Sequence, residues 1–293
     1  MDHPSDRADA SAHPAQIVFQ GADGHDLHAT IASTSPCSAT GGERPAIVLL
    51  HGGGPDHQMM VPLADRLPPT WAAILPDIRG YGRSVCRDPS RHTWGQYAAD
   101  VIALLDHLGI SSAVIGGAGL GGTTALWVAA RYPQRVRGVI VMSLEAIESD
   151  EERVGEIRAM EAFAAQVRND GIEAAWSPFL KELPFVIGAM VRDAIPRSDP
   201  GSIAAAAAIT HDRSFTSLEE LGAITAPTLI IPGIDSRHPT SLAKDAVAIL
   251  PQGQLAPVQM SHGMRSAADF AEVLAPSINT FLQQLDQTSP DRS

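Results

Sequence analysis

Residues 114–122, Val-Ile-Gly-Gly-Ala-Gly-Leu-Gly-Gly, join an apolar run to a stretch with a helical pattern. A strand, a glycine-packed turn and a helix in this order usually place a reactive side chain or a bound phosphate at the turn. A P-loop is disfavoured because its Lys-Ser/Thr pair is missing. Gly117, Gly119 and Gly122 fit the spacing of a dinucleotide motif, but no acid follows about twenty residues later. The stretch therefore favours a reactive turn over a nucleotide site.

The elements around this turn alternate between strands and helices. Continuous apolar runs at 46–52 and 71–77 are typical of strands in a parallel sheet that is covered on both faces. The alternation predicts βαβ units with right-handed crossovers, and so an α/β fold with a mostly parallel sheet. A hairpin is expected before the first of these strands, within residues 16–33. Further strands are expected at 112–117, 136–143, 226–233 and 253–259, and helices at 93–108, 121–132, 240–249 and 266–285.

The alternation stops between residues 145 and 222, where we find no good strand. Ser149 and Glu152 form a capping box ahead of an amphipathic helix, and shorter helical patterns follow. A helical insertion of this length is expected to form a cap over a pocket. The predicted organisation is a core of residues 15–144 and 223–286, a helical cap of residues 145–222, and disordered tails at 1–14 and 287–293.

The composition is that of an ordinary soluble globular protein, with 44% hydrophobic and 18% charged residues. A net charge of −12 without a local basic cluster disfavours nucleic acid and anionic membranes as partners. No apolar run is long enough to cross a bilayer, and the first residues lack the order of a secretion signal. Cys37 and Cys86 are expected to be reduced, which favours the cytoplasm.

Five motifs in order resemble the α/β-hydrolase family over about residues 15–286. They are a His-Gly loop at 49–57, an Asp-x-Arg-Gly-x-Gly-x-Ser turn at 77–84, the glycine turn at 117–122, the turn "PGIDSRHP" at 232–239 and "MSH" at 260–262. The resemblance implies an α/β-hydrolase fold and a hydrolase-like site. The family's nucleophile stands at the apex of Gly-x-Ser-x-Gly, where strand and helix nearly touch. In this chain the apex is Gly119, which has no nucleophilic atom.

The resemblance assigns roles to the residues around that apex. His262 takes the place of the general base and Asp235 that of its orienting acid, with Glu145 as the fallback acid. The amides of Gly53 and Leu120 correspond to the oxyanion hole, which does not depend on a side chain. Asp56 and His57 border the expected pocket, whereas Asp77 and Arg79 are expected to tie down loops. Four further histidines are expected to face solvent: His92, His107, His211 and His238.

Three hypotheses follow from a site without a nucleophile. An enzyme would use His262 and Asp235 to activate water or the substrate itself, with the oxyanion hole stabilising the developing charge. A pseudoenzyme or binding protein would hold a small ligand under the cap without turnover. An inactivated serine hydrolase would regain activity on Gly119→Ser. We favour the enzyme, acting on a small, largely apolar carbonyl, ester or lactone-type substrate. No metal or organic cofactor is indicated, because no ligand cluster or complete nucleotide motif is present.

Overall fold

The computed structural model describes residues 14–32, 44–147 and 149–288. Its centre is an eight-stranded sheet with the order β1-β2-β4-β3-β5-β6-β7-β8. The pairs β1–β2 and β2–β4 are antiparallel, and every pair from β4–β3 to β7–β8 is parallel. The strands are β1 (Ala15–Gln20), β2 (Asp26–Ala32), β3 (Ala46–Leu50), β4 (Ala72–Pro76), β5 (Ala113–Ala118), β6 (Val136–Met142), β7 (Thr228–Ile231) and β8 (Gly253–Leu255). The α/β-hydrolase fold expected from the sequence is therefore confirmed.

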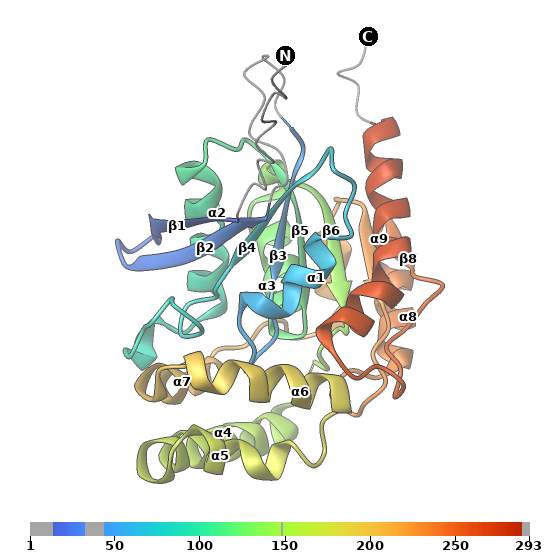
Figure 1. The fold of residues 1–293 in the computed structure, drawn as a ribbon. Coiled ribbons are helices and arrows are strands. Elements are labelled where there is room, and N and C mark those ends of the chain that lie inside the picture. The colour runs from blue at the N-terminus through green and yellow to red at the C-terminus, as the bar shows by residue number, and fades with distance from the viewer. Residues whose placement is uncertain (1–13, 33–43, 148, 289–293) are drawn as a thin grey trace, which may run out of the picture.

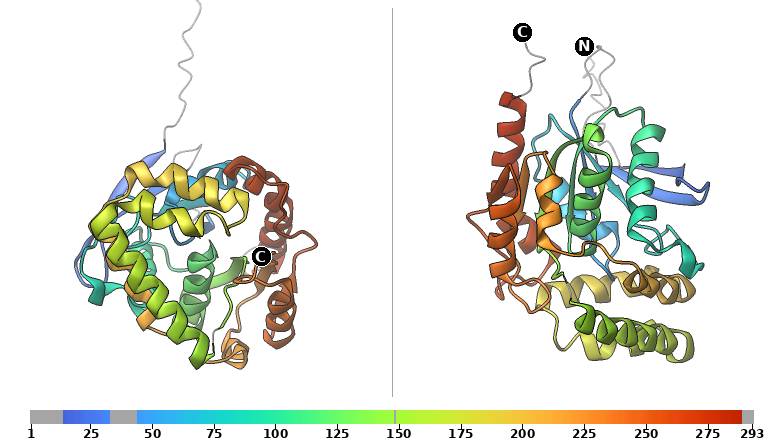
Figure 2. Two further views of the ribbon diagram at one scale, coloured as in Figure 1. Left: turned by 90° about the horizontal axis from the view of Figure 1, so that it is seen from below. Right: turned by 180° about the vertical axis from the view of Figure 1, so that it is seen from behind.

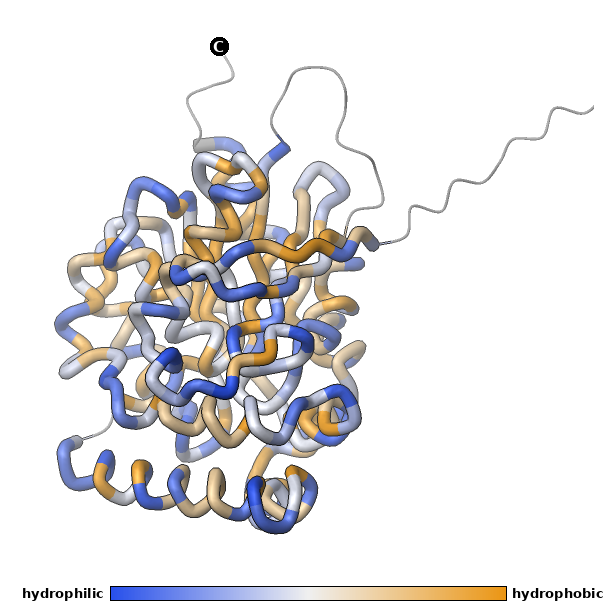
Figure 3. Tube along the Cα trace, turned by 90° about the vertical axis from the view of Figure 1, so that its left-hand side faces the viewer, coloured by the Kyte–Doolittle hydropathy of each residue, from blue (hydrophilic) through white to orange (hydrophobic). Residues whose placement is uncertain are grey.

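Two helical layers cover the sheet, and the strands send alternate side chains into each (Figure 1, Figure 2). Val48 and Leu50 of β3 join the core under α2, α3 and α8, whereas Ile47 and Leu49 join the core under α1 and α9. Apolar stretches run through the middle of the molecule in Figure 3, and hydrophilic residues gather along its loops. The layer helices are α1 (Val61–Ala64), α2 (Trp94–His107), α3 (Leu120–Arg131), α8 (Thr240–Ile249) and α9 (Ala267–Thr288).

A third group of helices lies between β6 and β7 in the sequence and below the sheet in Figure 1. It begins where Ser149 accepts a hydrogen bond from the amide of Glu152 and the Glu152 carboxylate accepts from the amide of Ser149, the predicted capping box. No strand occurs here among the described residues. Its α-helices are α4 (Asp150–Asp170), α5 (Ile172–Phe179), α6 (Phe185–Ala194) and α7 (Pro200–Ala206). We call this group the cap; its division from the core as a domain stays a prediction.

Several contacts hold the cap against the core loops. The Asp56 carboxylate accepts two hydrogen bonds from Arg197, and Arg87 pairs with Asp199 at 2.6 Å. A Cβ on Gly54 would come within 2.8 Å of the Trp176 ring, so the cap touches the loop after β3 directly. The cap is thus packed onto the loops that border the carboxyl ends of the parallel strands.

Some expectations need adjustment. Strand β8 ends at Leu255 instead of continuing to residue 259, and α9 continues to Thr288, through the start of the predicted tail. Most of the two predicted tails, and Cys37, lie outside the described residues, whereas Cys86 is a buried free thiol. No helix in the described ranges is long and apolar enough to span a membrane.

Candidate active site

The turn between β5 and α3 is sharp and closely packed. Gly119 has φ +47° and ψ −115°, and α3 begins at the next residue. A Cβ on Gly117 would lie 2.3 Å from the carbonyl carbon of Gly121, and a Cβ on Gly121 would lie 2.5 Å from the Leu50 carbonyl oxygen. Strand, turn and helix can approach this closely only because these two residues have no side chains. Gly119 therefore stands at the apex of a tight turn, between the carboxyl end of β5 and the first residue of α3.

Two side chains face the apex of this turn. An ideal Cβ on Gly119 would lie 3.4 Å from Nε2 of His238 and 3.7 Å from Oε1 of Glu145, and apart from the adjacent residues no other described residue has an atom within 4 Å. The three residues come from the loops after β5, β6 and β7, which are neighbours in the sheet. An imidazole and a carboxylate thus flank the space where a side chain at position 119 would stand. We call Gly119, Glu145, Asp235 and His238 the elbow cluster.

Asp235 orients the His238 ring. Its Oδ1 accepts hydrogen bonds from the ring Nδ1 at 2.8 Å and from the backbone amides of Arg237 and His238, each at 3.0 Å. Because Nδ1–H donates to the carboxylate, Nε2 is left as the acceptor that faces Gly119. Partial burial raises the pKa of Asp235, but its hydrogen bonds to His238 outweigh this and lower the pKa below the ordinary value. Asp235 therefore remains ionised at neutral pH.

The loop that carries this pair closes tightly around a glycine. A Cβ on Gly233 would lie 2.5 Å from both the Cβ and the carbonyl oxygen of His238. The Asp235 side chain caps the turn from within, as aspartate commonly does two or three residues ahead of a backbone amide. The turn thus brings His238 back toward the sheet, and only 17% of its side chain is exposed.

His262 does not have the predicted partner. Asp235 bonds to His238 instead, and His262 is exposed and more than 4 Å from the Cβ position of Gly119. The cause is the path of the loop after β8: the amide of Met260 donates to the Pro232 carbonyl, and the side chains of Met260 and Met264 are buried. With both methionines turned inward, His262 is left at a surface turn between them. The pairing of His262 with Asp235 and the exposure expected for His238 and His92 were wrong.

Backbone amides of Gly53 and Leu120 lie beside the elbow. A Cβ on Gly53 would be 4.0 Å from the Leu120 Cβ and 3.9 Å from the Tyr81 hydroxyl. Leu120 is the first residue of α3, so its amide has no partner within the helix. Among the described residues, neither amide donates to a protein acceptor. Both residues therefore have backbone donors without a protein acceptor near the apex, and their role as an oxyanion hole stays a prediction.

Tyr81 and His51 support this loop from below. Burial first, and the charge of Glu145 second, raise the pKa of Tyr81, so its hydroxyl stays protonated. The His51 ring accepts a hydrogen bond from the amide of Ile78 at 2.9 Å and donates to the carbonyl of Gly52 at 2.8 Å. His51 therefore fixes the glycine loop and leaves no ring nitrogen free for proton transfer.

Asp56 and His57 were predicted to border the pocket, and both are buried and hydrogen-bonded elsewhere. Asp56 holds Arg197 of the cap and accepts from the amide of Gln58. Nδ1 of His57 lies 2.7 Å from Oδ1 of Asp77. Burial raises the pKa of Asp77, but the hydrogen bond and charge of His57, together with His51 and the amide of Arg83, lower it below the ordinary value. These contacts tie the loop after β3 to the loop after β4 and to the cap.

A cavity of about 350 Å³ opens beside the elbow, between the cap and the core. Leu120 and Glu145 are among its lining residues, and Trp94 and Phe215 contribute aromatic surface. Seven charged residues also line it, so its wall is more polar than the sequence led us to expect. They are Glu145, Glu152, Arg153, Glu156, Asp212, Arg213 and Arg237.

Most of the cap aromatics serve packing instead. Phe163, Trp176 and Phe179 contact one another edge to face, with ring centroids 5.1–5.9 Å apart.

Within the described ranges, no group of three or more His, Cys, Asp or Glu side chains is arranged to hold a metal ion. The imidazole and carboxylates of the elbow cluster are groups that can transfer protons and form hydrogen bonds.

Comparison with known proteins agrees with this architecture. A 3-oxoadipate enol-lactonase from Acinetobacter baylyi is 28% identical over 221 residues, which cover 72% of this chain and 76% of that protein. An esterase from Thermogutta terrifontis superposes with a TM-score of 0.71 at 24% identity, over 94% of this chain and 99% of the other. An enol-lactonase from Burkholderia xenovorans gives 0.72 at 22% identity, over 92% and 100%. The family model for the alpha/beta hydrolase fold matches residues 45–233, more than half of the sequence, and the chain therefore belongs to that family.

Proposed function

We propose that this protein is an enzyme that acts on a small carbonyl, ester or lactone-type substrate without a serine nucleophile. His238, oriented by Asp235, is the general base in place of His262. The observation that carries the proposal is the position of Nε2, 3.4 Å from where a Cβ at residue 119 would stand. A base so close to an apex without a side chain can act only on water or on the substrate itself. The relatives described above, which include lactonases and an esterase, support a carbonyl substrate.

The proposed reaction conserves the family's electrostatics. Nε2 takes a proton from water as the water oxygen forms a bond to the carbonyl carbon, and the carbonyl π electrons move to its oxygen. The amides of Gly53 and Leu120 bind the resulting oxyanion, for which removal of one donor commonly costs about 10²–10³-fold in kcat. The Asp235 carboxylate stabilises the imidazolium that forms. When the intermediate collapses, the imidazolium returns its proton to the leaving oxygen.

The replacement His238→Ala tests this role on a panel of small aryl esters and lactones. We expect kcat/KM to fall about 10²–10⁴-fold for any substrate that wild type hydrolyses, because a positioned general base contributes that much. His262→Ala is the matched control and should leave kcat/KM within a factor of about two, since its ring is exposed and unpaired among the described residues. Equal activity of wild type and His238→Ala would refute the proposal.

Ligand binding without turnover is the second candidate function. The absence of a nucleophilic atom at Gly119 and the capped cavity of about 350 Å³ favour it. Saturable binding of esters or lactones, with no product above the uncatalysed rate in wild type, would establish this candidate over the enzyme.

A further inference from the structure

The carboxylate of Glu145 makes one side-chain hydrogen bond, and two backbone hydrogen bonds fix the loop that carries it. Its Oε2 accepts a hydrogen bond from the hydroxyl of Thr123, in the first turn of α3, at 3.1 Å. On either side of Glu145 in the chain, the amide of Ser143 donates to the Ile231 carbonyl at 2.9 Å, and the amide of Ala146 donates to the Arg237 carbonyl at 2.7 Å. The loop after β6 is thus tied both to the elbow helix and to the loop that carries Asp235 and His238.

Backbone strain marks the start of the same loop. Ser143 has φ +63° and is the only non-glycine residue with a positive φ in the described ranges. Such a conformation persists only where surrounding contacts impose it, and it clusters at functional sites. Here it reverses the chain directly after β6, so that Leu144 is buried and Glu145 lies over the elbow. The reversal places a carboxylate at the active site at a conformational cost.

The other carboxylate oxygen is directed at the open space. Oε1 of Glu145 lies 3.7 Å from the Cβ position of Gly119, and no described residue donates a hydrogen bond to it. Glu145 is not the acid that orients the histidine, because Asp235 holds the Nδ1 of His238. Oε1 of Glu145 and Nε2 of His238 therefore face the same small space next to Gly119, and both are hydrogen-bond acceptors to which no described residue donates. A water molecule has two O–H groups and matches this pair of acceptors.

We propose that Glu145 is a catalytic residue that holds the nucleophilic water jointly with His238, in the space that a side chain at position 119 would fill. The water donates one O–H to Nε2 of His238 and the other to Oε1 of Glu145, which directs an oxygen lone pair away from both groups. On attack, the O–C bond forms, the proton on the His238 side moves to Nε2, and the carbonyl electron pair moves to oxygen. Glu145 keeps its hydrogen bond and remains ionised.

This assignment rests on the proposed function and accounts for the glycine. A methyl group at position 119 would occupy the water's space, 3.4 Å from Nε2.

The charged groups around the space are consistent with a neutral nucleophile. Tyr81, whose pKa is raised by burial and by the Glu145 charge, contributes a neutral hydroxyl, and Arg237 is engaged by Glu156 of α4 at 2.7 Å. Glu145 and Asp235 are thus the two carboxylates that flank the histidine.

The replacement Glu145→Gln tests the assignment, because it keeps the shape and turns one acceptor into a donor. We expect kcat to fall about 10- to 100-fold with KM within about threefold, since the water is misoriented while substrate contacts remain. Glu151→Gln, an exposed change in the first turn of α4, is the control for lost charge and should match wild type. Thermal unfolding of both variants verifies that they are folded.

A high-resolution crystal structure of wild type and of Gly119→Ala gives a readout that needs no turnover. We expect a water oxygen within hydrogen-bond distance of Nε2 and Oε1 in wild type, and its loss in Gly119→Ala. Absence of that water, or a Glu145→Gln enzyme as active as Glu151→Gln, would overturn the role of Glu145. If His238→Ala abolishes turnover in that case, the proposed function stands without it. If His238→Ala also leaves turnover intact, the proposed function fails too.

Discussion

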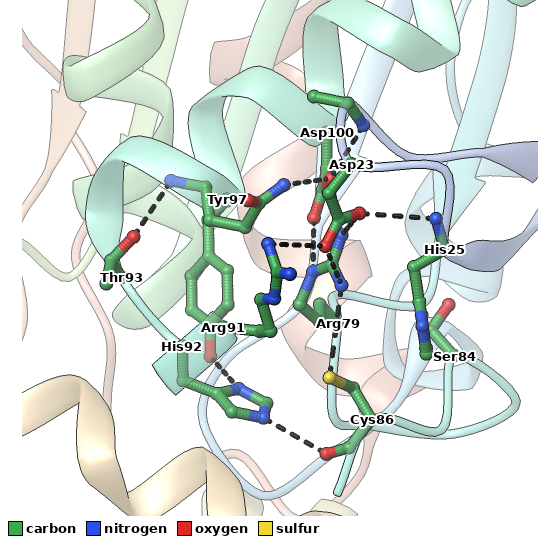
Figure 4. A network of polar contacts seen from close by, with 12 residues as sticks. Asp23, His25, Arg79, Ser84, Cys86, Arg91, His92, Thr93, Tyr97 and Asp100 are labelled. Carbon is green, nitrogen blue, oxygen red and sulfur yellow. Dashed lines mark hydrogen bonds and ion pairs between the residues drawn. The ribbon is translucent and has the colours of Figure 1, made fainter. Parts of the chain in front are cut away.

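Two clusters of polar side chains border the sheet, one around Arg79 and one at the elbow, and they differ in whether all of their polar groups are paired. The Arg79 cluster consists of Asp23, Arg79, His92, Tyr97 and Asp100 (Figure 4). There the Arg79 guanidinium is fully buried and bonds to Asp100 at 2.8 and 2.9 Å and to Asp23 at 2.7 Å. Every group in it is engaged by a neighbour, whereas the elbow cluster leaves Nε2 and Oε1 directed at open space.

The difference separates a structural role from a chemical one. A buried network in which every polar group is paired stabilises the fold only while all its members are present, because removal of one leaves a buried charge unpaired. A cluster with acceptors left open gains little from its own contacts and is available to bind a further molecule. Substitutions in the Arg79 cluster should therefore change the free energy of unfolding, and substitutions in the elbow cluster should change turnover.

The largest expected effect is on turnover, from Asp235→Asn. The amide would favour the wrong tautomer of His238 and could not stabilise its imidazolium, so kcat should fall about 10³–10⁴-fold. The melting temperature should change little, because the asparagine side-chain oxygen can still accept the hydrogen bonds from the amides of Arg237 and His238. Steady-state kinetics beside a thermal melt measures both, with Asp245→Asn on the exposed side of α8 as the matched control. A large loss of stability with unchanged kcat would reverse the roles given to the two clusters.

In the Arg79 cluster, Asp100→Ala should act on stability alone. It leaves the guanidinium of Arg79 buried with Asp23 as its remaining strong partner, which should cost about 3–5 kcal/mol in the free energy of unfolding. Asp106→Ala on the same helix removes an exposed pair with Arg135 and should cost at most about 1 kcal/mol. Urea unfolding measures both. Equal effects of the two replacements would mean that the Arg79 cluster does not support the fold.

The pH dependence of stability should expose His92 in the same cluster. Burial lowers the pKa of His92 to about 4, and its ring nitrogens contact the Tyr97 hydroxyl at 2.8 Å and the Cys86 carbonyl at 3.1 Å. The unfolded chain takes up this proton near pH 6.5, so it binds more protons than the folded chain between pH 6.5 and 4. Stability from this group is complete above pH 6.5 and falls as the pH is lowered, by on the order of 3 kcal/mol.

Urea unfolding at pH 7 and pH 4 for wild type and His92→Gln checks this slope. The variant should start less stable and lose less between the two pH values. His51, whose pKa burial also lowers, adds to the slope in both proteins and cancels in the comparison. His107→Gln, at an exposed end of α2, should keep the wild-type slope. An identical slope in His92→Gln would show that His92 does not resist protonation in the folded state.

Much of the fold followed from the sequence because its patterns are local. Buried strands such as 46–50 read as apolar runs, and the capping box at Ser149 starts a helix through contacts within four residues. The position of Gly119 at the apex also followed from local packing, since Gly117 and Gly121 leave the chain only one way to turn.

The identity of the histidine depended on contacts that the sequence does not display. Whether His238 or His262 faces the elbow is decided by the packing of Met260 and Met264 and by the closure of the 233–239 turn on Gly233. One local signal was available: an aspartate three residues before a histidine, after a glycine, can cap the turn and hold the ring. Likewise, the pairing of Asp56 with Arg197 joins residues 141 apart.

The replacement Gly119→Ser tests whether the elbow can support a serine nucleophile, and its expected effect on stability is modest. Gly119→Ser introduces a side chain at φ +47°, which should cost about 1–2 kcal/mol in the free energy of unfolding. Its Cβ would lie 3.4 Å from Nε2 of His238, so the hydroxyl is within reach of a base already oriented by Asp235. We expect the serine to be activated and to form an acyl-enzyme, with a burst of product from an aryl ester.

A fluorophosphonate probe reports this directly, since it should label Gly119→Ser and leave wild type and Gly119→Ala unlabelled. Rapid labelling together with fast deacylation would mean that the site still supports serine chemistry in full. Labelling with slow deacylation would fit a site arranged for water held by Glu145, because the serine side chain then fills the space of that water. No labelling of a folded Gly119→Ser protein would contradict the orientation given to His238, since a serine at this apex would then lack its base.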